Sequence, residues 1–160
     1  MNETGSKFLS EIVSGGQTGV DRAALDVALS LHIPHGGWCP KGRRAEDGPI
    51  ALKYLLKETD EEKYEVRTEK NVVDSDGTLI FSKGLLTGGT LLTLEMARMH
   101  HRPFIIIDLA EDQSQRKSID RLMAWISENR IRRMNVAGPR ESTVAGIYNE
   151  VRDFLSKALG

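Results

Sequence analysis

Residues 12–26 constrain the fold of this chain most strongly. An apolar run ends in Ser-Gly-Gly at residues 14–16, and an alanine-rich amphipathic pattern begins after Gln-Thr-Gly at residues 17–19. This order predicts a strand, a glycine turn and the start of a helix. Glycines let the backbone approach a ligand, and the first N–H groups of a helix attract anions, so the turn is typical of a phosphate site. It can equally be a plain connection in which Thr18 and Asp21 form a capping box.

A second stretch repeats this architecture. Residues 78–81 are a short apolar run that predicts a buried strand, and Thr-Gly-Gly-Thr at residues 87–90 opens a helical pattern over residues 91–101. This junction would offer another set of free N–H groups. Two such junctions at the same edge of a sheet favour one shared anionic ligand.

Strand and helix patterns alternate along the remaining chain. We predict an α/β fold: a single Rossmann-like domain over residues 1–160, with a flexible tail at 1–7 and an open, mainly parallel sheet of about five strands with helices on both faces. We assign residues 45–56 to a loop with a short helix and residues 57–63 to a solvated connector, and we make no assignment for residues 64–76. The predicted strands are residues 9–14, 35–38, 78–81, 103–109 and 134–137, and the other helices are residues 19–31, 118–128 and 143–159. Ligands of such sheets bind at the carboxyl ends of the strands.

Composition excludes several classes of function. The chain has 22 basic and 23 acidic residues and a net charge of -1, which argues against nucleic acid as a partner. It contains neither an apolar run long enough for a membrane span nor a signal peptide, and we expect a cytoplasmic protein. Cys39 is the only cysteine, and the four histidines lack metal-ligand spacing, so neither an internal disulfide nor a metal site built by the protein is expected.

Local cations follow two of the predicted strands. Lys41, Arg43 and Arg44 lie in a loop after the second strand, and Arg140 lies between the last strand and the last helix. If these loops share a sheet edge with the glycine turns, the cations would face the same anion. Alternatively they form a solvated surface patch.

Acid–base chemistry is not required by any motif. Asp21, Asp76 and Glu95 could act as acids or bases if they converge, but each also suits a structural role as a cap, a turn residue or part of a solvated helix face. A nucleophile elbow of the form G-x-S-x-G is missing from the sequence. We therefore favour a binding protein over an enzyme.

Several long motifs resemble one family. They are SGGQTGVDR at residues 14–22, GGWCPKGRRAEDG at 36–48, RTEKNV at 67–72, SDGT at 75–78 and TGGT at 87–90. The sequence resembles the molybdenum carrier (molybdenum cofactor carrier protein) family from about residue 12 to residue 109, and more weakly over residues 135–142. The resemblance implies a Rossmann-like protein related to lysine-decarboxylase-like proteins and phosphoribohydrolases, which binds molybdenum cofactor and forms a homo-oligomer. The phosphoribohydrolase motif P-G-G-x-G-T-x-x-E is spaced differently here, which leaves a hydrolytic role for Glu95 unsupported.

The resemblance also suggests how the ligand would be held. Molybdenum cofactor is a pterin with a terminal phosphate and a dithiolene-bound oxo-metal, so it needs N–H groups, cations and polar contacts. The N–H groups would come from Gly15, Gly16, Gln17, Thr18, Gly19, Thr87, Gly88, Gly89 and Thr90, with Asp21 at the same turn; the cations would be Lys41, Arg43, Arg67 and Arg140, and the pterin contacts Asn71, Ser75 and Asp76.

Three functions are compatible with these patterns. The first is a non-catalytic carrier that binds and protects the phosphorylated pterin cofactor, a small anionic ligand, and delivers it to molybdoenzymes. The second is a nucleotide-processing enzyme that acts on an N-glycosidic bond. The third is a nucleotide-sensing module that acts through a protein partner.

Overall fold

The computed structural model describes residues 8–111 and 114–160. The flexible tail predicted for residues 1–7 lies outside the described residues. The strands are β1 (Glu11–Val13), β2 (His35–Gly36), β3 (Trp38–Cys39), β4 (Lys57–Glu58), β5 (Gly77–Ser82), β6 (Phe104–Asp108) and β7 (Arg133–Ala137). The helices are α2 (Val20–Ser30), α3 (Tyr64–Val73), α4 (Gly88–Met99), α5 (Gln115–Glu128) and α6 (Ile147–Leu159).

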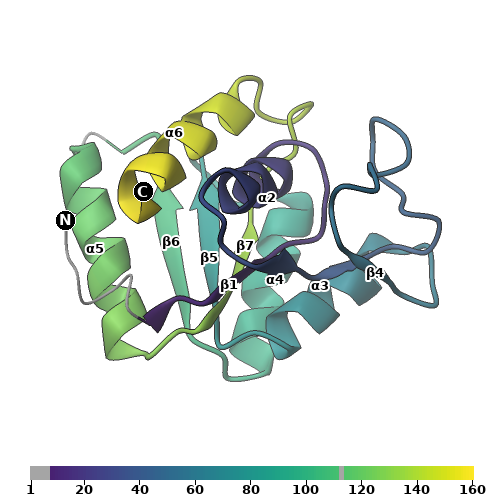
Figure 1. Ribbon diagram of the computed structural model, residues 1–160, viewed down its shortest axis with the longest axis horizontal. Helices are drawn as coiled ribbons and strands as arrows, with labels where there is room; N and C mark the ends of the chain where they lie inside the picture. Colours follow the sequence, from purple (N-terminus) through teal and green to yellow (C-terminus); the bar gives the residue numbers. More distant parts are fainter. Residues whose placement is uncertain (1–7, 112–113) are drawn as a thin grey trace.

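The described residues form a five-stranded parallel sheet with the order β2-β1-β7-β5-β6 (Figure 1). Strand β7, the last in the chain, pairs with β1 on one side and β5 on the other. All strands run the same way, so their carboxyl ends meet at one edge. The predicted α/β class with a mainly parallel sheet is confirmed.

Helices cover both faces of this sheet. On one face α2 packs along α6, with α5 beside α6, and on the other face α3 packs against α4 (Figure 1). No helix in residues 8–111 and 114–160 has the length and apolar character needed to cross a bilayer.

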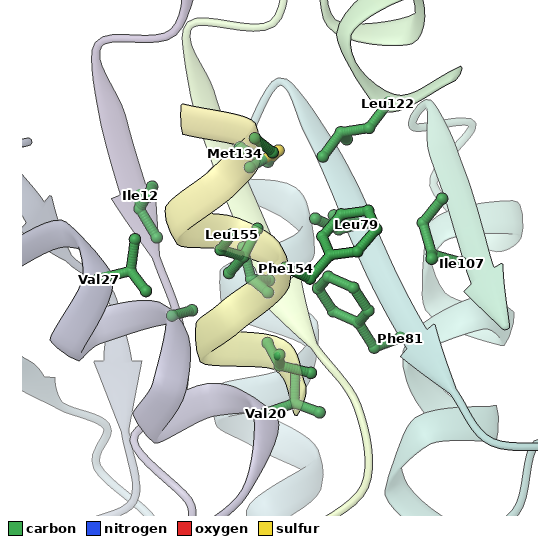
Figure 2. Close-up of a cluster of buried hydrophobic side chains, with 14 of the residues drawn as sticks. Ile12, Val20, Val27, Leu79, Phe81, Ile107, Leu122, Met134, Phe154 and Leu155 are labelled. Atoms are coloured by element: carbon green, nitrogen blue, oxygen red, sulfur yellow. The ribbon is translucent and has the colours of Figure 1, made fainter. Parts of the chain in front are cut away.

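The main core lies between the sheet and the layer of α2, α5 and α6 (Figure 2). Phe81 of β5 contacts Phe154 of α6 edge to face, with 5.3 Å between the ring centroids and 81° between the ring planes. All six residues of β5 are buried, as expected for a strand covered on both faces. This rigid core fixes where the carboxyl ends of the strands project.

A satellite core lies beside the sheet, under the loop that follows β3. Leu25, Cys39, Ala45, Ile50, Tyr54 and Leu56 form it. Cys39 is fully buried there, and burial raises the pKa of its thiol. Strands β3 and β4 pair with each other in a separate two-stranded sheet, and Cys39 of β3 belongs to this cluster.

The predicted strand over residues 35–38 is divided between two sheets. Residues 35–36 form β2 of the main sheet, whereas Trp38 begins β3. Gly37 separates them with a φ of 123°, a conformation that L side chains rarely adopt. A Cβ at this glycine would lie 2.4 Å from the carbonyl oxygen of Ser14, so the chain turns where only glycine fits.

The prediction of a short helix within residues 45–56 is wrong, because these residues form turns and bends. The guanidinium of Arg43 supplies the reason: it donates to the carbonyl oxygens of Ile50 at 2.9 Å, Ala51 at 2.8 Å and Tyr54 at 2.7 Å. These carbonyls are satisfied by a side chain instead of a helical N–H.

Two further segments differ from the sequence interpretation. Residues 57–58, expected in a solvated connector, form β4, which pairs with β3. Residues 64–73, which received no assignment, form α3. The buried positions of α3 include Arg67 and Asn71, so polar residues on its inner face hide the apolar periodicity of a helix.

Candidate functional site

A cavity of about 820 Å³ lies at the carboxyl ends of β5 and β7. Ser82 of β5 and Asn135 of β7 reach its lining from the sheet. Its other walls come from the glycine turn after β1, from α3, from the start of α4, and from the loop between β7 and α6. Segments far apart in the sequence therefore meet at one edge of the sheet.

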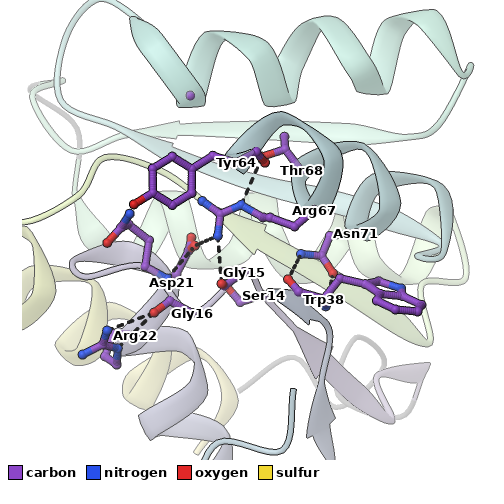
Figure 3. Close-up of polar contacts among 12 residues, drawn as sticks. Ser14, Gly15, Gly16, Asp21, Arg22, Trp38, Tyr64, Arg67, Thr68 and Asn71 are labelled. Carbon is purple, nitrogen blue, oxygen red and sulfur yellow. Dashed lines mark hydrogen bonds and ion pairs between the residues drawn. The ribbon is translucent and has the colours of Figure 1, made fainter. Parts of the chain in front are cut away.

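The glycine turn after β1 is covered by Arg67 of α3 (Figure 3). Arg67 is 8% exposed, and its Nη1 donates to the carbonyl oxygen of Gly15 at 2.8 Å. A Cβ on Gly15 would lie 2.4 Å from the same Nη1 atom. A side chain at this position could be accommodated only if Arg67 moved from its place over the turn.

Asp21 in the first turn of α2 also lines the cavity. Its Oδ2 accepts a hydrogen bond from the backbone N–H of Gln17 at 3.2 Å and lies 4.0 Å from Nη1 of Arg67. Burial raises the pKa of Asp21, and the nearby charge of Arg67 offsets only part of that effect. The cavity wall thus holds a carboxyl group that ionises less readily than an exposed one.

Asn71, one turn further along α3, fixes the loop between the two sheets. Its Oδ1 accepts from the backbone N–H of Trp38 at 2.8 Å, and its Nδ2 donates to the Trp38 carbonyl at 2.9 Å. The amide thus satisfies both backbone groups of one residue. Asn71 lines the cavity, while its hydrogen bonds hold α3 against β3.

Three guanidinium groups of the described chain surround the ring of Tyr64. Arg44 lies 4.9 Å from the ring centroid, Arg67 5.2 Å and Arg140 5.3 Å. Tyr64, Arg67 and Arg140 all line the cavity. We call Arg44, Tyr64, Arg67 and Arg140 the arginine–tyrosine cluster. The ring faces hold cations near one another, which makes this wall of the cavity suited to an anion.

Glu46 joins the loops at the rim. It accepts hydrogen bonds from the hydroxyls of Thr18 and Ser142, and it lies 3.7 Å from Nη1 of Arg140. Burial disfavours its charged form, but the bonds from Ser142 and Thr18 outweigh burial and lower the pKa of Glu46. The Glu46 carboxylate therefore links its own loop to two other segments, the glycine turn after β1 and the loop after β7.

The start of α4 forms the opposite wall. Helix α4 begins at Gly88, and Thr87 before it is extended, with φ at -138°. The first N–H groups of a helix lack intrahelical acceptors. Apart from the adjacent residues and the backbone of α4 itself, no heavy atom of the described residues lies within 4 Å of a Cβ built on Gly88 or Gly89. An anion can therefore approach this helix end closely.

Comparison with known proteins places the chain in a family. A family model described as the circularly permutated YpsA SLOG family matches residues 12–159. The chain belongs to this family. The crystal structure of a protein named putative molybdenum carrier protein, from Syntrophus aciditrophicus SB, is 45% identical, has a TM-score of 0.93 and matches over 95% of this chain and 96% of that one. This likeness confirms the resemblance to molybdenum carriers, and no curated protein matches the chain.

The strand order of this SLOG protein is consistent with a circular permutation. If β7 and α6 were moved to the front, the sheet order would read 3-2-1-4-5, the order of a dinucleotide-binding sheet. The strand order would then reverse between β7 and β5. Ligands of open α/β sheets bind at that point, and the cavity of this SLOG protein lies there.

The structure brings ten of the residues proposed from sequence into the cavity lining. They come from the turn after β1, from α3, from the start of α4 and from the loop after β7. They are Gly15, Gln17, Asp21, Arg67, Asn71, Thr87, Gly88, Gly89, Thr90 and Arg140.

Gly16, Thr18 and Gly19 lie outside that lining, although they belong to the same turn. A Cβ on Gly16 would meet Ile50 of the satellite core at 2.8 Å, so this glycine packs inward. Gly19 has a φ of 78°, and its Cβ would lie 2.4 Å from the carbonyl oxygen of Pro139. These residues serve the packing of the turn.

Lys41 and Arg43 also lie outside the cavity lining. Lys41 is exposed on the loop after β3. The guanidinium of Arg43 donates hydrogen bonds to backbone carbonyls within residues 50–56, including the Leu56 carbonyl at 3.3 Å. Its neighbour Arg44, the third cation of this loop, also lies outside the cavity lining and contacts Tyr64 instead.

Ser75 and Asp76 lie at the other edge of the sheet, because they precede β5 and the cavity lies beyond its carboxyl end. The hydroxyl of Ser75 donates to the Asn71 carbonyl at 2.6 Å. Asp76 Oδ2 accepts from the backbone N–H groups of Arg132 and Arg133 at 3.0 and 2.8 Å. Both residues have structural partners there.

Sequence reasoning missed several residues of the lining. Tyr64 lies in the stretch that received no assignment, and its position one turn before Arg67 becomes meaningful only once α3 is known. Ser82 and Asn135 sit at or near the carboxyl ends of correctly predicted strands, and this position is a signal that could have found them.

Proposed function

We propose that this protein binds and protects molybdenum cofactor, as a non-catalytic carrier. The observation that carries the proposal is the cavity of about 820 Å³ at the reversal point of the sheet, with an open helix end on one wall and the arginine–tyrosine cluster on another. The 45% identity to a protein named as a molybdenum carrier supports this choice of cargo.

The chemistry of the cargo matches these two walls. The N–H groups at Gly88 and Gly89, with the hydroxyls of Thr87 and Thr90, suit the terminal phosphate. Arg44 and the other guanidinium groups suit the anionic oxo-metal end. Among the described residues, no cluster of three or more His, Cys, Asp or Glu could hold a metal ion. A carrier needs none, because the dithiolene of the cofactor already binds the metal.

In this proposal the carrier works in the cytoplasm as a homo-oligomer and delivers the cofactor to molybdoenzymes. Native mass spectrometry of protein purified gently from cells that make the cofactor tests it. We expect a bound mass that contains both pterin and molybdenum, and the same spectrum reports the number of subunits. Folded protein that shows no saturable binding of the cofactor would contradict the proposal.

A double variant, Arg44→Gln with Arg140→Gln, tests the cationic wall. It removes two positive charges beside Tyr64, and we expect it to retain less cofactor than the wild type. Arg116→Gln is the matched control, because Arg116 is exposed on α5 and forms an ion pair with Asp120 of the same helix. Equal loading of all three proteins would show that neither Arg44 nor Arg140 contributes to binding of the cargo.

A second candidate is cleavage of an N-glycosidic bond in a nucleotide. One observation favours it: Asp21 is a buried carboxyl group of raised pKa in the cavity wall, as expected of a general acid. Glu95, the acid considered from sequence, is exposed on α4 and lies outside the cavity lining. Incubation with nucleoside monophosphates and chromatography for the free base tests this activity, with Asp21→Asn as the inactive control. Absence of product from protein that binds the nucleotide would exclude it.

A further inference from the structure

The side-chain amide of Gln17 has a fixed orientation. Gln17 is 5% exposed, and its Oε1 accepts hydrogen bonds from the backbone N–H groups of Thr18 at 3.1 Å and Glu46 at 2.8 Å. A flipped amide would place its NH₂ group against these two donors. The oxygen is therefore committed to the protein, and the nitrogen points elsewhere.

The nitrogen of this amide is a buried donor with no partner among the described residues. Gln17 lines the cavity. An unpaired buried donor costs the folded state free energy, and native proteins rarely leave one without a functional reason. Gln17 Nε2 thus marks a position where a ligand oxygen would complete a hydrogen bond.

The charge beside Gln17 indicates which kind of oxygen fits. Asp21 lines the same cavity, and its Oδ2 accepts from the backbone N–H of Gln17 at 3.2 Å. A phosphate oxygen next to this carboxyl group would meet like charge, whereas a neutral ring carbonyl would not. The carboxyl group in turn accepts from N–H donors, so the two side chains together match a ring edge that carries a carbonyl beside an N–H group.

We propose that Gln17 and Asp21 read the lactam edge of a 2-amino-4-oxopyrimidine ring, the edge that pterins share with guanine. Gln17 Nε2 donates to the ring carbonyl, and Asp21 accepts from the ring N–H and the amino group. The inference rests on the proposed function, since it assigns the pterin end of the cargo to the wall formed by Gln17 and Asp21. The start of α4 then receives the phosphate.

Two matched pairs of probes test this assignment by calorimetry. One pair is 6-hydroxymethylpterin monophosphate and its 2,4-diamino analogue, and the other is GMP and the monophosphate of 2,6-diaminopurine riboside. Within each pair the ring carbonyl is replaced by an amino group, and the adjacent ring N–H becomes an unprotonated ring nitrogen. We expect the wild type to bind the carbonyl form at least about tenfold more tightly, because the amino group leaves Gln17 Nε2 facing another donor.

Gln17→Glu is the decisive variant. One carboxylate oxygen can still accept from the N–H groups of Thr18 and Glu46, while the other replaces the donor with an acceptor. We expect both Gln17→Glu and Gln17→Leu to lower the preference for the carbonyl form, Gln17→Glu the more strongly. The preference that remains reports Asp21, which still accepts from the ring N–H of the carbonyl form. Thermal melting confirms that each variant is folded. The control is Gln115→Glu on exposed α5, which should keep the wild-type ratio.

The outcomes separate this inference from the carrier function. A Gln17-dependent preference within the guanine pair, without any binding of the pterin pair, supports the inference and contradicts the carrier function. Binding of the pterin pair with a ratio that Gln17→Glu leaves unchanged contradicts the inference and leaves the carrier function standing. Failure of folded wild type to bind any of the four probes overturns the inference.

Discussion

The two glycine junctions look alike in sequence but differ in what surrounds them. After β1, the chain itself fills the space beside the glycines: a Cβ on Gly15 would lie 2.4 Å from Arg67, and one on Gly19 would lie 2.4 Å from Pro139. At the start of α4, apart from the adjacent residues and the backbone of α4 itself, no described heavy atom lies within 4 Å of such a Cβ on Gly88 or Gly89. The first junction therefore uses its glycines for close packing, whereas the second leaves a helix end open to a ligand.

The sharpest test of this contrast substitutes alanine at each junction. Gly19→Ala should lower the free energy of unfolding by about 3 kcal/mol or more, because its φ is positive and its Cβ would meet backbone atoms. Gly89→Ala should leave that free energy unchanged or raise it by up to about 1 kcal/mol, since alanine favours a helix. Urea unfolding measures both.

Binding of a phosphorylated ligand should follow the opposite order. Gly89→Ala should weaken binding of 6-hydroxymethylpterin monophosphate, because the new methyl group lies where the phosphate would approach. If Gly89→Ala proves as unstable as Gly19→Ala, or binds the probe as well as the wild type, the two junctions do not differ in the way described.

Arg67→Met should have the next largest effect on stability. It removes the hydrogen bond to the Gly15 carbonyl and leaves the buried carboxyl group of Asp21 without its nearby cation. We expect a loss of about 2–3 kcal/mol in the free energy of unfolding. Arg22→Met is a useful comparison, because Arg22 contacts the same turn at Gly16 from a more exposed position and should cost less.

The pH dependence of stability isolates Asp21. Burial raises the pKa of Asp21 above 3.8, so the folded state binds this proton more readily than the unfolded state. The contribution of Asp21 to stability is therefore greatest below about pH 4 and falls as pH rises through the folded pKa. Asp21→Asn keeps an oxygen for the N–H of Gln17 and should remove this decline. Urea unfolding of both proteins at several acidic pH values measures this difference. If the free energy of unfolding changes with pH in the same way for both proteins, the assignment to Asp21 is refuted.

The smallest stability effects are expected in the loop after β3, which carries Lys41 and Arg44. Arg44→Gln and Lys41→Gln should each change the free energy of unfolding by less than about 0.5 kcal/mol, because both residues are exposed. Only Arg44→Gln should weaken binding of the proposed anionic ligand, since Arg44 lies 4.9 Å from the Tyr64 centroid. A weaker complex with Lys41→Gln would extend the site beyond the arginine–tyrosine cluster.

Sequence patterns predicted the sheet well because buried parallel strands leave a strong signal. The apolar residues of β5 and β6 are continuous, and the helices after the glycine turns have clear apolar stripes. Helix α3 escaped prediction because Arg67 and Asn71 occupy its buried face. Arg67 is buried because it donates to the Gly15 carbonyl, which is distant in the sequence. A partner of this kind cannot be recognised from the residues around Arg67.

Only those parts of the candidate site that follow directly from the positions of strand ends could be predicted from the sequence. Gly15 and Gly88 follow strands and lie at the carboxyl edge, whereas Asp76 precedes a strand and lies at the opposite edge. The adjacent residues Arg43 and Arg44 have opposite environments, because the φ of 55° at Arg43 turns the chain between them. Local sequence does not encode which of two neighbouring arginines contacts Tyr64 and which binds backbone carbonyls.

The position of β7 in the sheet has a consequence for synthesis on the ribosome. Strands β1 and β5 are both hydrogen-bonded to β7, yet β7 is translated after them. The nascent chain can pair β1 with β2 and β5 with β6, but these two halves have no common strand until residues 133–137 leave the exit tunnel. The cavity, which residues 135–140 help to line, therefore forms only after almost the whole chain has been translated.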